Sequence, residues 1–284
     1  HFPLYLLVIS GHLAQKLVEL RSPGTEFWCW GYSFPWQTRT QLVPRWSPNA
    51  VCTIFVAESL LDLFEHQRDA RHLEMAASAA KFIQQLIWSD GQKVTSLCYP
   101  LPTMKTPIHN ANLLGAALLA RVARLAGDKQ LLEPAFRLAR YSVAGQHADG
   151  SWPYGEGAKH EWVDNFHTGF NLGALHSLGM NADTAEFESS VRKGFEFYRE
   201  HFFREDGAPR YFHNKTYPID AHCVAQSLIT LVELSDLDPN ALILARRVYD
   251  WTMANMWDDG GYFYYRVLPF CRIKTSYIRW VQAW

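Results

Sequence analysis

Residues 149–181 read DGSWPYGEGAKHEWVDNFHTGFNLGALHSLGMN, and this stretch carries the unit from which the chain is built. It opens on an Asp-Gly turn, continues through an aromatic segment, and then enters a helix that is apolar nearly all round, with small Ala and Gly residues interleaved. Such a composition is typical of a helix buried on most of its sides. The stretch therefore predicts a turn, an aromatic loop and a buried helix in succession.

The same order recurs along the chain. Asp-Gly pairs stand at residues 90, 149, 206 and 259, which are 59, 57 and 53 residues apart. After each of the four predicted buried helices comes a more amphipathic helix, with its charged residues on one stripe. The buried helices are expected to begin at Asn49, Asn110, Asp164 and Asp220, whose side chains are suited to capping. A period of this length indicates stacked helix hairpins.

Alternating buried and amphipathic helices predict a double ring, with the buried helices inside and the amphipathic helices outside. A linear solenoid fits the same period, but it leaves one helix face open, and these buried helices are too apolar for that. We expect one all-α domain over residues 1–284, an α/α toroid of the (α/α)6 type. Four hairpins are complete, while helices near residues 3–20 and from Thr275 belong to incomplete ones.

With this pattern the chain resembles the α/α toroid superfamily, which includes terpenoid cyclases, protein prenyltransferases and several (α/α)6 carbohydrate-active families. A closer likeness is to toroid proteins encoded beside bacterial exopolysaccharide genes. It is carried by WGYSFPWQTR (30–39), VDNFHTGF (163–170), YPIDAHCVAQ (217–226) and RWVQAW (279–284). This resemblance implies a role in bacterial envelope-polysaccharide metabolism without defining a reaction.

Composition narrows the classes of partner. The formal net charge of −1, with no run of five like charges, gives no basis for binding nucleic acid or an anionic membrane through charge. No apolar stretch reaches the roughly 18 residues that a membrane span needs. The five cysteines form no CxxC pair and predict reduced thiols in a cytoplasmic protein. Because metal-ligand spacings, a DxDD cluster and phosphate-binding glycine loops are missing from the sequence, we expect no metal or cofactor.

The buried helices of a ring begin at the same mouth, so polar side chains in their first turns are expected to converge. Asp164 and His167 stand three apart on one helix face, where the carboxylate can orient the imidazole as an acid/base unit. Asp220 and His222 hold the matching place in the next repeat, and a pair of carboxylates is what glycoside hydrolysis requires. We take these four as candidate catalytic residues; capping acids and buried structural histidines are the competing interpretation.

Other residues are candidates for binding a sugar. Amides near the helix starts suit sugar hydroxyls or a uronate carboxylate, and the aromatic loop at 27–47 suits sugar C–H faces. Tyr32, Tyr217 and Tyr277 are candidate bases for a lyase or an epimerase, with structural roles as the competing interpretation. IRWVQAW resembles the WVQ-containing helix of the N-acylglucosamine 2-epimerase family, which implies that Trp280 and Gln282 line the cavity. The family's Glu after the Gln is replaced, since Ala283 and Trp284 follow. The candidates are Trp30, Tyr32, Trp36, Gln37, Arg39, Asn110, Asn112, Gln226, Tyr277, Arg279, Trp280 and Gln282.

These residues favour a carbohydrate-active enzyme of bacterial envelope or exopolysaccharide metabolism, acting on an oligosaccharide or polysaccharide as a hydrolase, lyase or epimerase. The alternative is a non-catalytic glycan-binding or assembly protein, which would depend on Trp30, Trp36 and Trp280 rather than on the two carboxylates. A third hypothesis, an isoprenoid-binding toroid, requires a cavity with few polar groups, and the His, Asn and Asp side chains at the mouth argue against it.

Overall fold

The computed structural model describes residues 4–37, 42–91 and 93–284, without the side chains of residues 4–8 and of Trp280. The chain divides into two compact units. Unit 1 comprises His1–Ser142 with Met180–Asp183, and unit 2 comprises Val143–Gly179 with Thr184–Trp284. The single domain expected over residues 1–284 stays a prediction.

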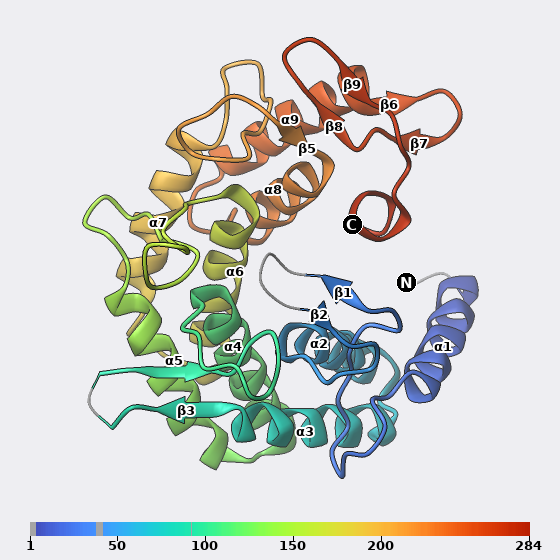
Figure 1. The fold of residues 1–284 in the computed structure, drawn as a ribbon, viewed down its shortest axis with the longest axis vertical. Helices are drawn as coiled ribbons and strands as arrows, with labels where there is room; N and C mark the ends of the chain where they lie inside the picture. The colour runs from blue at the N-terminus through green and yellow to red at the C-terminus, as the bar shows by residue number, and fades with distance from the viewer. Residues whose placement is uncertain (1–3, 38–41, 92) are drawn as a thin grey trace. The chain divides into compact units, whose positions relative to one another are not determined.

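Unit 1 is built on three helices that pack against one another (Figure 1). They are α2 (Ala50–Gln67), α3 (Ala70–Gln85) and α4 (His109–Ala126). Strand β1 pairs antiparallel with β2, and β3 pairs antiparallel with β4. The other elements are α1 (Leu4–Glu19), β1 (Trp36–Gln37), β2 (Leu42–Val43), β3 (Ile87–Ser89), β4 (Thr95–Leu97), the 3-10 helix η1 (Lys129–Leu131) and α5 (Leu132–Ala144), whose end lies in unit 2.

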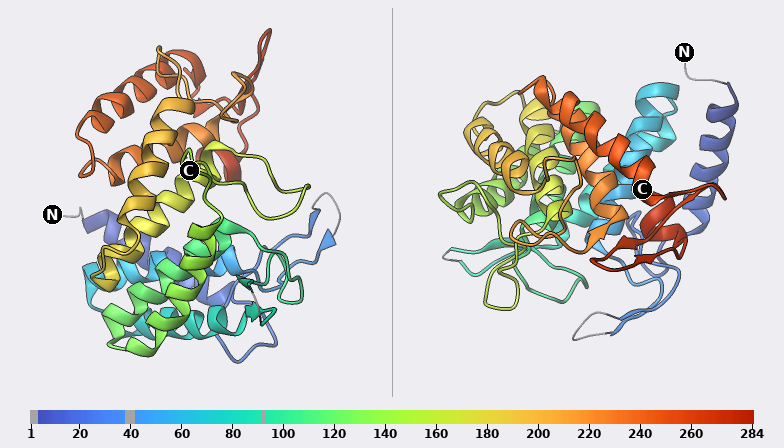
Figure 2. Two further views of the ribbon diagram at one scale, coloured as in Figure 1. Left: turned by 90° about the vertical axis from the view of Figure 1, so that its left-hand side faces the viewer. Right: turned by 90° about the horizontal axis from the view of Figure 1, so that it is seen from above.

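Unit 2 contains a packed pair of helices, α8 (Ala221–Glu233) and α9 (Asn240–Met256), which lie side by side in both views of Figure 2. A three-stranded antiparallel sheet has the order β5-β8-β9, and β6 pairs with β7. The other elements are α6 (Asn165–Ala182), α7 (Glu188–His201), β5 (Ile219–Asp220), β6 (Trp257–Asp258), β7 (Tyr262–Phe263), β8 (Arg266–Val267), β9 (Arg272–Ile273) and the π-helix η2 (Ile278–Gln282). The last residues of α6 belong to unit 1.

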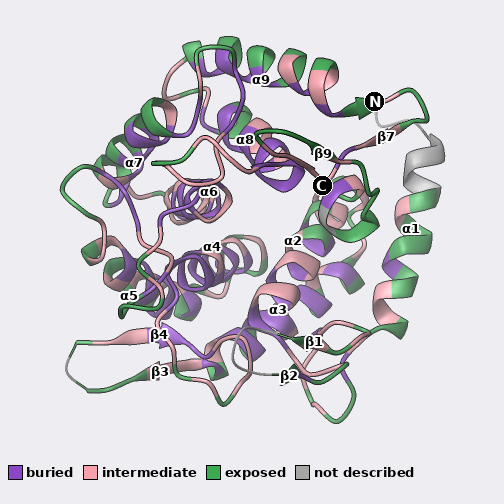
Figure 3. Cartoon of the chain, turned by 45° about the horizontal axis from the view of Figure 1, so that its top comes forward, coloured by how far each residue is buried: buried purple, intermediate pink, exposed green. Residues whose placement is uncertain are grey.

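The predicted alternation of buried and amphipathic helices is present. Thirteen of the 18 residues of α4 and eight of the 13 residues of α8 are buried, against six of 17 in α9. Figure 3 shows the buried residues gathered on α4, α6 and α8, and wide exposed stripes on α7 and α9. Helix α2 departs from the prediction, since only six of its 18 residues are buried.

Two of the four Asp-Gly turns, at residues 149 and 206, dock on the amphipathic helices of their own repeats. Gly150 and Gly207 have φ values of +94° and +92°, which glycine adopts without strain. A Cβ on Gly150 would lie 2.4 Å from the carbonyl oxygen of Lys193 in α7, and one on Gly207 would lie 2.7 Å from that of Arg247 in α9. In both turns the preceding aspartate accepts a hydrogen bond from the amide two residues ahead. Close approach as well as backbone conformation therefore requires glycine.

The fourth turn differs by one residue from the prediction. Instead of Asp259 and Gly260, the turn uses Asp258, whose Oδ1 accepts a hydrogen bond from the Gly260 amide at 3.0 Å. The residue with positive φ is Gly261, at +85°. The repeat thus survives with a shifted glycine.

Three of the four predicted capping side chains accept hydrogen bonds from first-turn amides. These are Asn49, Asp164 and Asp220, with distances of 3.0, 2.9 and 2.9 Å. The prediction is wrong for Asn110, because α4 begins one residue earlier, at His109, and is capped at the backbone of Ile108. The helix expected from Thr275 begins instead at Ile278, as η2.

All five cysteines are free thiols, as predicted. The cytoplasmic setting inferred from them stays a prediction. No helix in the described part of the chain combines the length and the apolar character that crossing a membrane demands.

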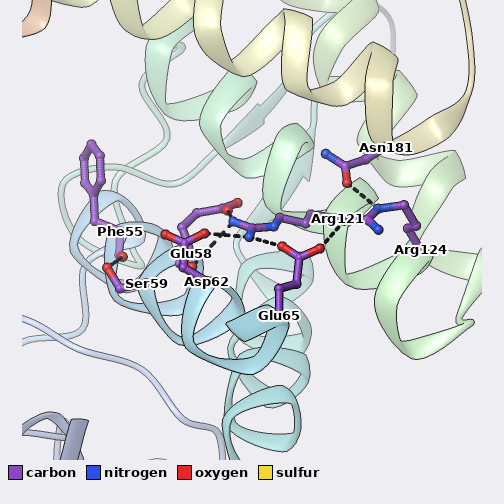
Figure 4. Close-up of polar contacts among 8 residues, drawn as sticks. All are labelled: Phe55, Glu58, Ser59, Asp62, Glu65, Arg121, Arg124 and Asn181. Carbon is purple, nitrogen blue, oxygen red and sulfur yellow. Dashed lines mark hydrogen bonds and ion pairs between the residues drawn. The ribbon is translucent and has the colours of Figure 1, made fainter. Parts of the chain in front are cut away.

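An ion-pair network joins α2 to α4 in unit 1 (Figure 4). The Arg121 guanidinium, with 13% of its side chain exposed, donates to Glu58 at 2.5 Å, Asp62 at 2.6 Å and Glu65 at 2.5 Å. Arg124 donates to the other oxygen of Glu65 at 2.8 Å. One arginine of α4 thereby holds three acidic residues of α2.

Candidate functional site

Among the described residues, the shortest contact between a histidine and a carboxylate lies at the start of α6. His167 Nδ1 is 2.7 Å from Asp164 Oδ2, and the other oxygen of Asp164 accepts a hydrogen bond from the His167 amide at 2.9 Å. Asp164 is buried, whereas 20% of the His167 side chain is exposed. The predicted pairing of Asp164 with His167 is therefore present, with the imidazole on the accessible side.

The Asp164 carboxylate sets the tautomer of His167. A carboxylate only accepts hydrogen bonds, so the proton of a neutral His167 ring sits on Nδ1 and leaves the Nε2 lone pair available. Oδ2 accepts a further hydrogen bond from Trp162 Nε1 at 2.8 Å. Three donors thus hold the carboxylate in place, and the carboxylate in turn holds the imidazole.

Aromatic rings surround this pair. The Tyr154 ring stacks on Trp162, with centroids 4.5 Å apart and planes 12° apart, and lies 4.5 Å from the His167 ring. The Phe166 ring lies 4.1 Å from His167 and 4.6 Å from His222. Below, Asp164, His167 and His222 together with these three rings are called the His167 site.

His222, in the first turn of α8, is the second imidazole of the site. It is buried, and the Trp284 ring lies 4.6 Å from its own. Burial lowers the pKa of His222 to about 4, and the charge of His167 acts in the same direction while Asp164 opposes it. At neutral pH this imidazole is therefore uncharged.

Asp220 is bound to an arginine. Its Oδ2 accepts a hydrogen bond from Arg266 Nε at 2.6 Å, and its Oδ1 accepts one from the His222 amide at 2.9 Å. Burial raises the pKa of Asp220, and the charge of Arg266 opposes that rise. Burial also raises the pKa of Tyr211, to which the charges of both Asp164 and Asp220 contribute. The charges of both carboxylates thus act on Tyr211, and each carboxylate accepts hydrogen bonds from groups of the protein.

Four of the predicted sugar-binding residues form contacts within the protein. Trp30 is buried and its Nε1 donates to the carbonyl of α1 residue Leu17 at 2.7 Å. The buried amide of Asn112 accepts from Ser96 and Leu97 and donates to Ser142. The others are Gln226, buried and donating to Thr230 at 3.0 Å, and Gln282, whose amide pairs with both backbone groups of Phe263 at 3.0 and 2.8 Å. These contacts hold the four side chains in the fold, and their roles in sugar binding stay predictions.

The remaining candidates of unit 1 stay predictions. Tyr32 stacks on Phe34 and meets the edge of Trp36, with ring centroids 5.2 and 5.7 Å apart, and Gln37 is exposed. Asn110 is buried, and among the described residues none donates to its Oδ1. Arg39 lies outside the described residues. Convergence of these side chains with the His167 site was predicted from the ring alone and is not tested.

In unit 2, Tyr277 and Arg279 are exposed, and the Tyr277 ring meets Tyr265 edge-on at 4.9 Å. The side chain of Trp280 lies outside the described part of the structure. The segment around η2 is anchored instead by Gln282 on β7. Roles for these three residues in sugar binding stay predictions.

Trp162, Tyr154 and Arg266 were not singled out from the sequence. Trp162 stands two residues before Asp164, which is the spacing of an extended segment whose alternate side chains share a side. Arg266 reaches Asp220 through a strand pairing over 46 residues of sequence, and no local pattern announces it. Within the described residues, no group of three His, Cys, Asp or Glu side chains is arranged as metal ligands.

A surface groove of about 380 Å³ lies in unit 1, lined by residues from the end of α3, from β3 and from the start of α5. None of the candidate site residues borders it. The candidate site is therefore defined by its side-chain chemistry, at the starts of α6 and α8, and not by the volume of a surface groove.

No protein-family model matches the chain, and no curated protein matches it. Solved structures do match. D-mannose isomerase aligns with a TM-score of 0.69 and 10% identity over 95% of this chain and 77% of that one. The cellobiose 2-epimerase of Spirochaeta thermophila aligns with a TM-score of 0.66 and 12% identity over 94% of this chain and 74% of that one. The unsaturated glucuronyl hydrolase of Bacillus sp. GL1 aligns with a TM-score of 0.60 and 14% identity over 75% of this chain and 64% of that one. This chain thus spans about two thirds to three quarters of theirs. The likeness confirms the predicted fold: the chain is an all-α α/α toroid.

Proposed function

We propose that the chain is a carbohydrate-active enzyme that moves a proton at a sugar carbon, with His167 as the base. The observation that carries the proposal is the 2.7 Å contact between Asp164 Oδ2 and His167 Nδ1. It leaves Nε2 of a partly exposed imidazole with an available lone pair, as a general base requires. Aspartate-oriented histidines serve as bases in many unrelated enzymes.

The reaction begins at a C–H bond beside a carbonyl or carboxyl group. The C–H bond breaks, its electron pair moves toward the adjacent oxygen, and the proton passes to His167 Nε2. Return of a proton to the opposite face yields an epimer, return to the neighbouring carbon yields an isomer, and departure of a β-substituent yields an unsaturated product. His222, uncharged at neutral pH, is the second proton-handling group of the site.

A sugar substrate is supported by the rings of the site. Tyr154 and Phe166 flank His167, and flat aromatic faces bind the C–H faces of sugars. Solved toroids of similar structure include a mannose isomerase and a cellobiose epimerase, whose names state sugar substrates. The setting in bacterial envelope or exopolysaccharide metabolism rests on the sequence resemblance alone and is part of the proposal.

Hydrolysis through an Asp164–Asp220 pair has less support. A hydrolase needs one carboxyl group that delivers a proton and one that activates water or attacks the sugar. Asp220 is instead held in an ion pair with Arg266, and Asp164 accepts three hydrogen bonds. Both carboxylates are thus engaged by donors of the protein, whereas Nε2 of His167 has an available lone pair.

A product-resolved screen in D2O tests the proposal. The full chain is incubated with D-mannose, cellobiose, D-glucuronate and a uronate-containing oligosaccharide, and proton NMR follows both new products and deuterium entering at carbon. We expect either deuterium at a single carbon of an epimer or isomer of one substrate, or an unsaturated product, in which the carbon that lost its proton takes up no deuterium. Saturated reducing ends released without deuterium at carbon would establish a hydrolase instead. Glycan binding with no exchange would establish the non-catalytic alternative.

A further inference from the structure

Arg266 is held in a fixed orientation beside the His167 site. Strand β8 pairs antiparallel with β5 so that Arg266 stands directly opposite Asp220, and its Nε donates to Asp220 Oδ2 at 2.6 Å. The guanidinium carbon lies 4.5 Å from the centre of the Tyr265 ring and 5.8 Å from that of the Tyr211 ring. A carboxylate and two aromatic faces thus fix the guanidinium plane.

The pair with Asp220 uses only part of the arginine. An arginine carries five N–H groups, and the bond to Asp220 uses the one on Nε. Among the described residues, none accepts a hydrogen bond from the two terminal nitrogens, and 31% of the side chain is exposed. If Arg266 served only as the counter-charge of buried Asp220, its terminal N–H groups would not need to stay unbonded. These N–H groups on the two terminal nitrogens, called the fork below, are thus available to a ligand. That fork matches the two oxygens of a carboxylate.

The fork belongs to the same cluster as the base. The centre of the Tyr211 ring lies 5.8 Å from the Arg266 guanidinium carbon and 5.7 Å from the centre of the Phe166 ring. Phe166 in turn contacts the rings of both His167 and His222. Because Asp220 also accepts from the His222 amide, two independent contacts connect Arg266 with the histidines.

The segment that carries Arg266 is basic. Residues 260–284 hold four Lys and Arg residues and no Asp or Glu, within a chain whose net charge is −1. Arg272 stands opposite Val267, the neighbour of Arg266, in the β8–β9 hairpin and is exposed. Lys274 follows β9, and its charge is paired with Asp258 at 3.8 Å. Arg272, which forms no ion pair with the described residues, thus adds a positive charge to the hairpin that carries the fork, which favours an anionic ligand over a neutral one.

We infer that the sugar bound at the His167 site is a uronic acid, with its carboxylate held by the terminal N–H groups of Arg266. The inference takes the place of the sugar from the proposed function, and it adds that the protein recognises a carboxylate on that sugar. A neutral hexose bears a hydroxymethyl group at that position and cannot form the charge-assisted, two-pronged contact. Arg266 is accordingly a specificity-determining residue.

Binding measured without turnover tests this inference. D-galacturonate is compared with D-galactose, and an oligogalacturonate with its carboxyl-reduced counterpart, by calorimetric titration. Replacing Arg266 alone would leave buried Asp220 without a counter-charge and could unfold the chain. The informative comparison is therefore Asp220→Asn against Asp220→Asn/Arg266→Gln. The first keeps the fork, because the amide oxygen of an asparagine still accepts from Arg266 Nε, and the second removes it. Arg246→Gln, on the exposed face of α9, is the matched control.

We expect the native chain, Asp220→Asn and Arg246→Gln to prefer the uronate of each pair. The double variant should lose about 10- to 100-fold of that preference, the size of a hydrogen-bonded charge contact. Equal binding of both members of each pair, binding of neither, or a preference that survives in the double variant would overturn the inference. Uronate binding through Arg266 with neither deuterium exchange nor an unsaturated product would refute the proposed reaction alone, and exchange on a neutral sugar without uronate preference would refute this inference alone.

Discussion

Arg121→Met removes the cation at the centre of the network in Figure 4 while keeping an apolar side chain of similar reach. Three acidic residues of α2 would then face α4 without it. Breaking a buried ion pair costs about 3–5 kcal/mol. Because Glu58 keeps 26% of its side chain exposed, water screens part of the repulsion, and we expect a loss of about 2–3 kcal/mol. For a chain of this size the melting temperature should fall by roughly 3–5 °C.

The loss should depend on pH. Burial raises the pKa of Glu58, and the charge of Arg121 opposes that rise in the native chain. Without Arg121 the pKa of Glu58 in the folded state rises further above its value in the unfolded chain. At pH values between the unfolded and the folded pKa of Glu58, the folded variant binds a proton that the unfolded chain has released. The deficit is therefore full at alkaline and neutral pH and shrinks as the pH falls through the folded pKa of Glu58.

Urea unfolding followed by circular dichroism at pH 8 and pH 5 measures both effects. Arg124→Met is the matched control, since Arg124 reaches the same network but has 44% of its side chain exposed, and we expect it to cost less than about 1 kcal/mol. If Arg121→Met proves no more destabilising than Arg124→Met, or loses the same free energy at both pH values, the reasoning about this buried network is refuted.

Three further predictions concern two of the Asp-Gly turns and the two histidines. Gly91→Ala should lower the free energy of unfolding by about 1–2 kcal/mol, because of its positive φ alone. Gly207→Ala should lower it by about 1–3 kcal/mol more, because its Cβ also meets the backbone of α9. Thermal unfolding of the two variants measures the difference. Asp164→Asn should lower kcat about 10²- to 10⁴-fold, because an amide favours the wrong tautomer of His167, and steady-state kinetics on a well-folded variant checks this. The folded pKa of His222, about 4, lies below its ordinary value, so the unfolded chain binds more protons in between. Stability should therefore fall from about pH 6.5 toward pH 4, by up to about 3 kcal/mol, and urea unfolding of His222→Phe should show a flatter profile.

The repeat was predictable because its signals are local. An Asp-Gly turn such as Asp149-Gly150 is specified by one residue that caps and one that tolerates positive φ, and both are visible in the sequence. Asp164 and His167 were paired from their spacing on one helix, and the structure shows that contact at 2.7 Å.

Partners brought together by tertiary structure were not predictable. Arg266 meets Asp220 through the register of β8 on β5, which no local pattern specifies. Asn112 and Gln282 have the polar chemistry of sugar ligands, but their amides bond to backbone groups of the protein itself. A polar side chain near a helix start is equally suited to either partner, so only the structure separates the two uses.

The rate of solvent deuterium entering the substrate tests the central claim most directly, with His167→Gln compared against His176→Gln. His176 lies on the same helix and also faces an acid, Asp236 at 3.7 Å, but it is outside the His167 site. We predict native exchange in His176→Gln and a loss of at least about 100-fold in His167→Gln. Exchange that continues at the native rate without the His167 imidazole would contradict the account.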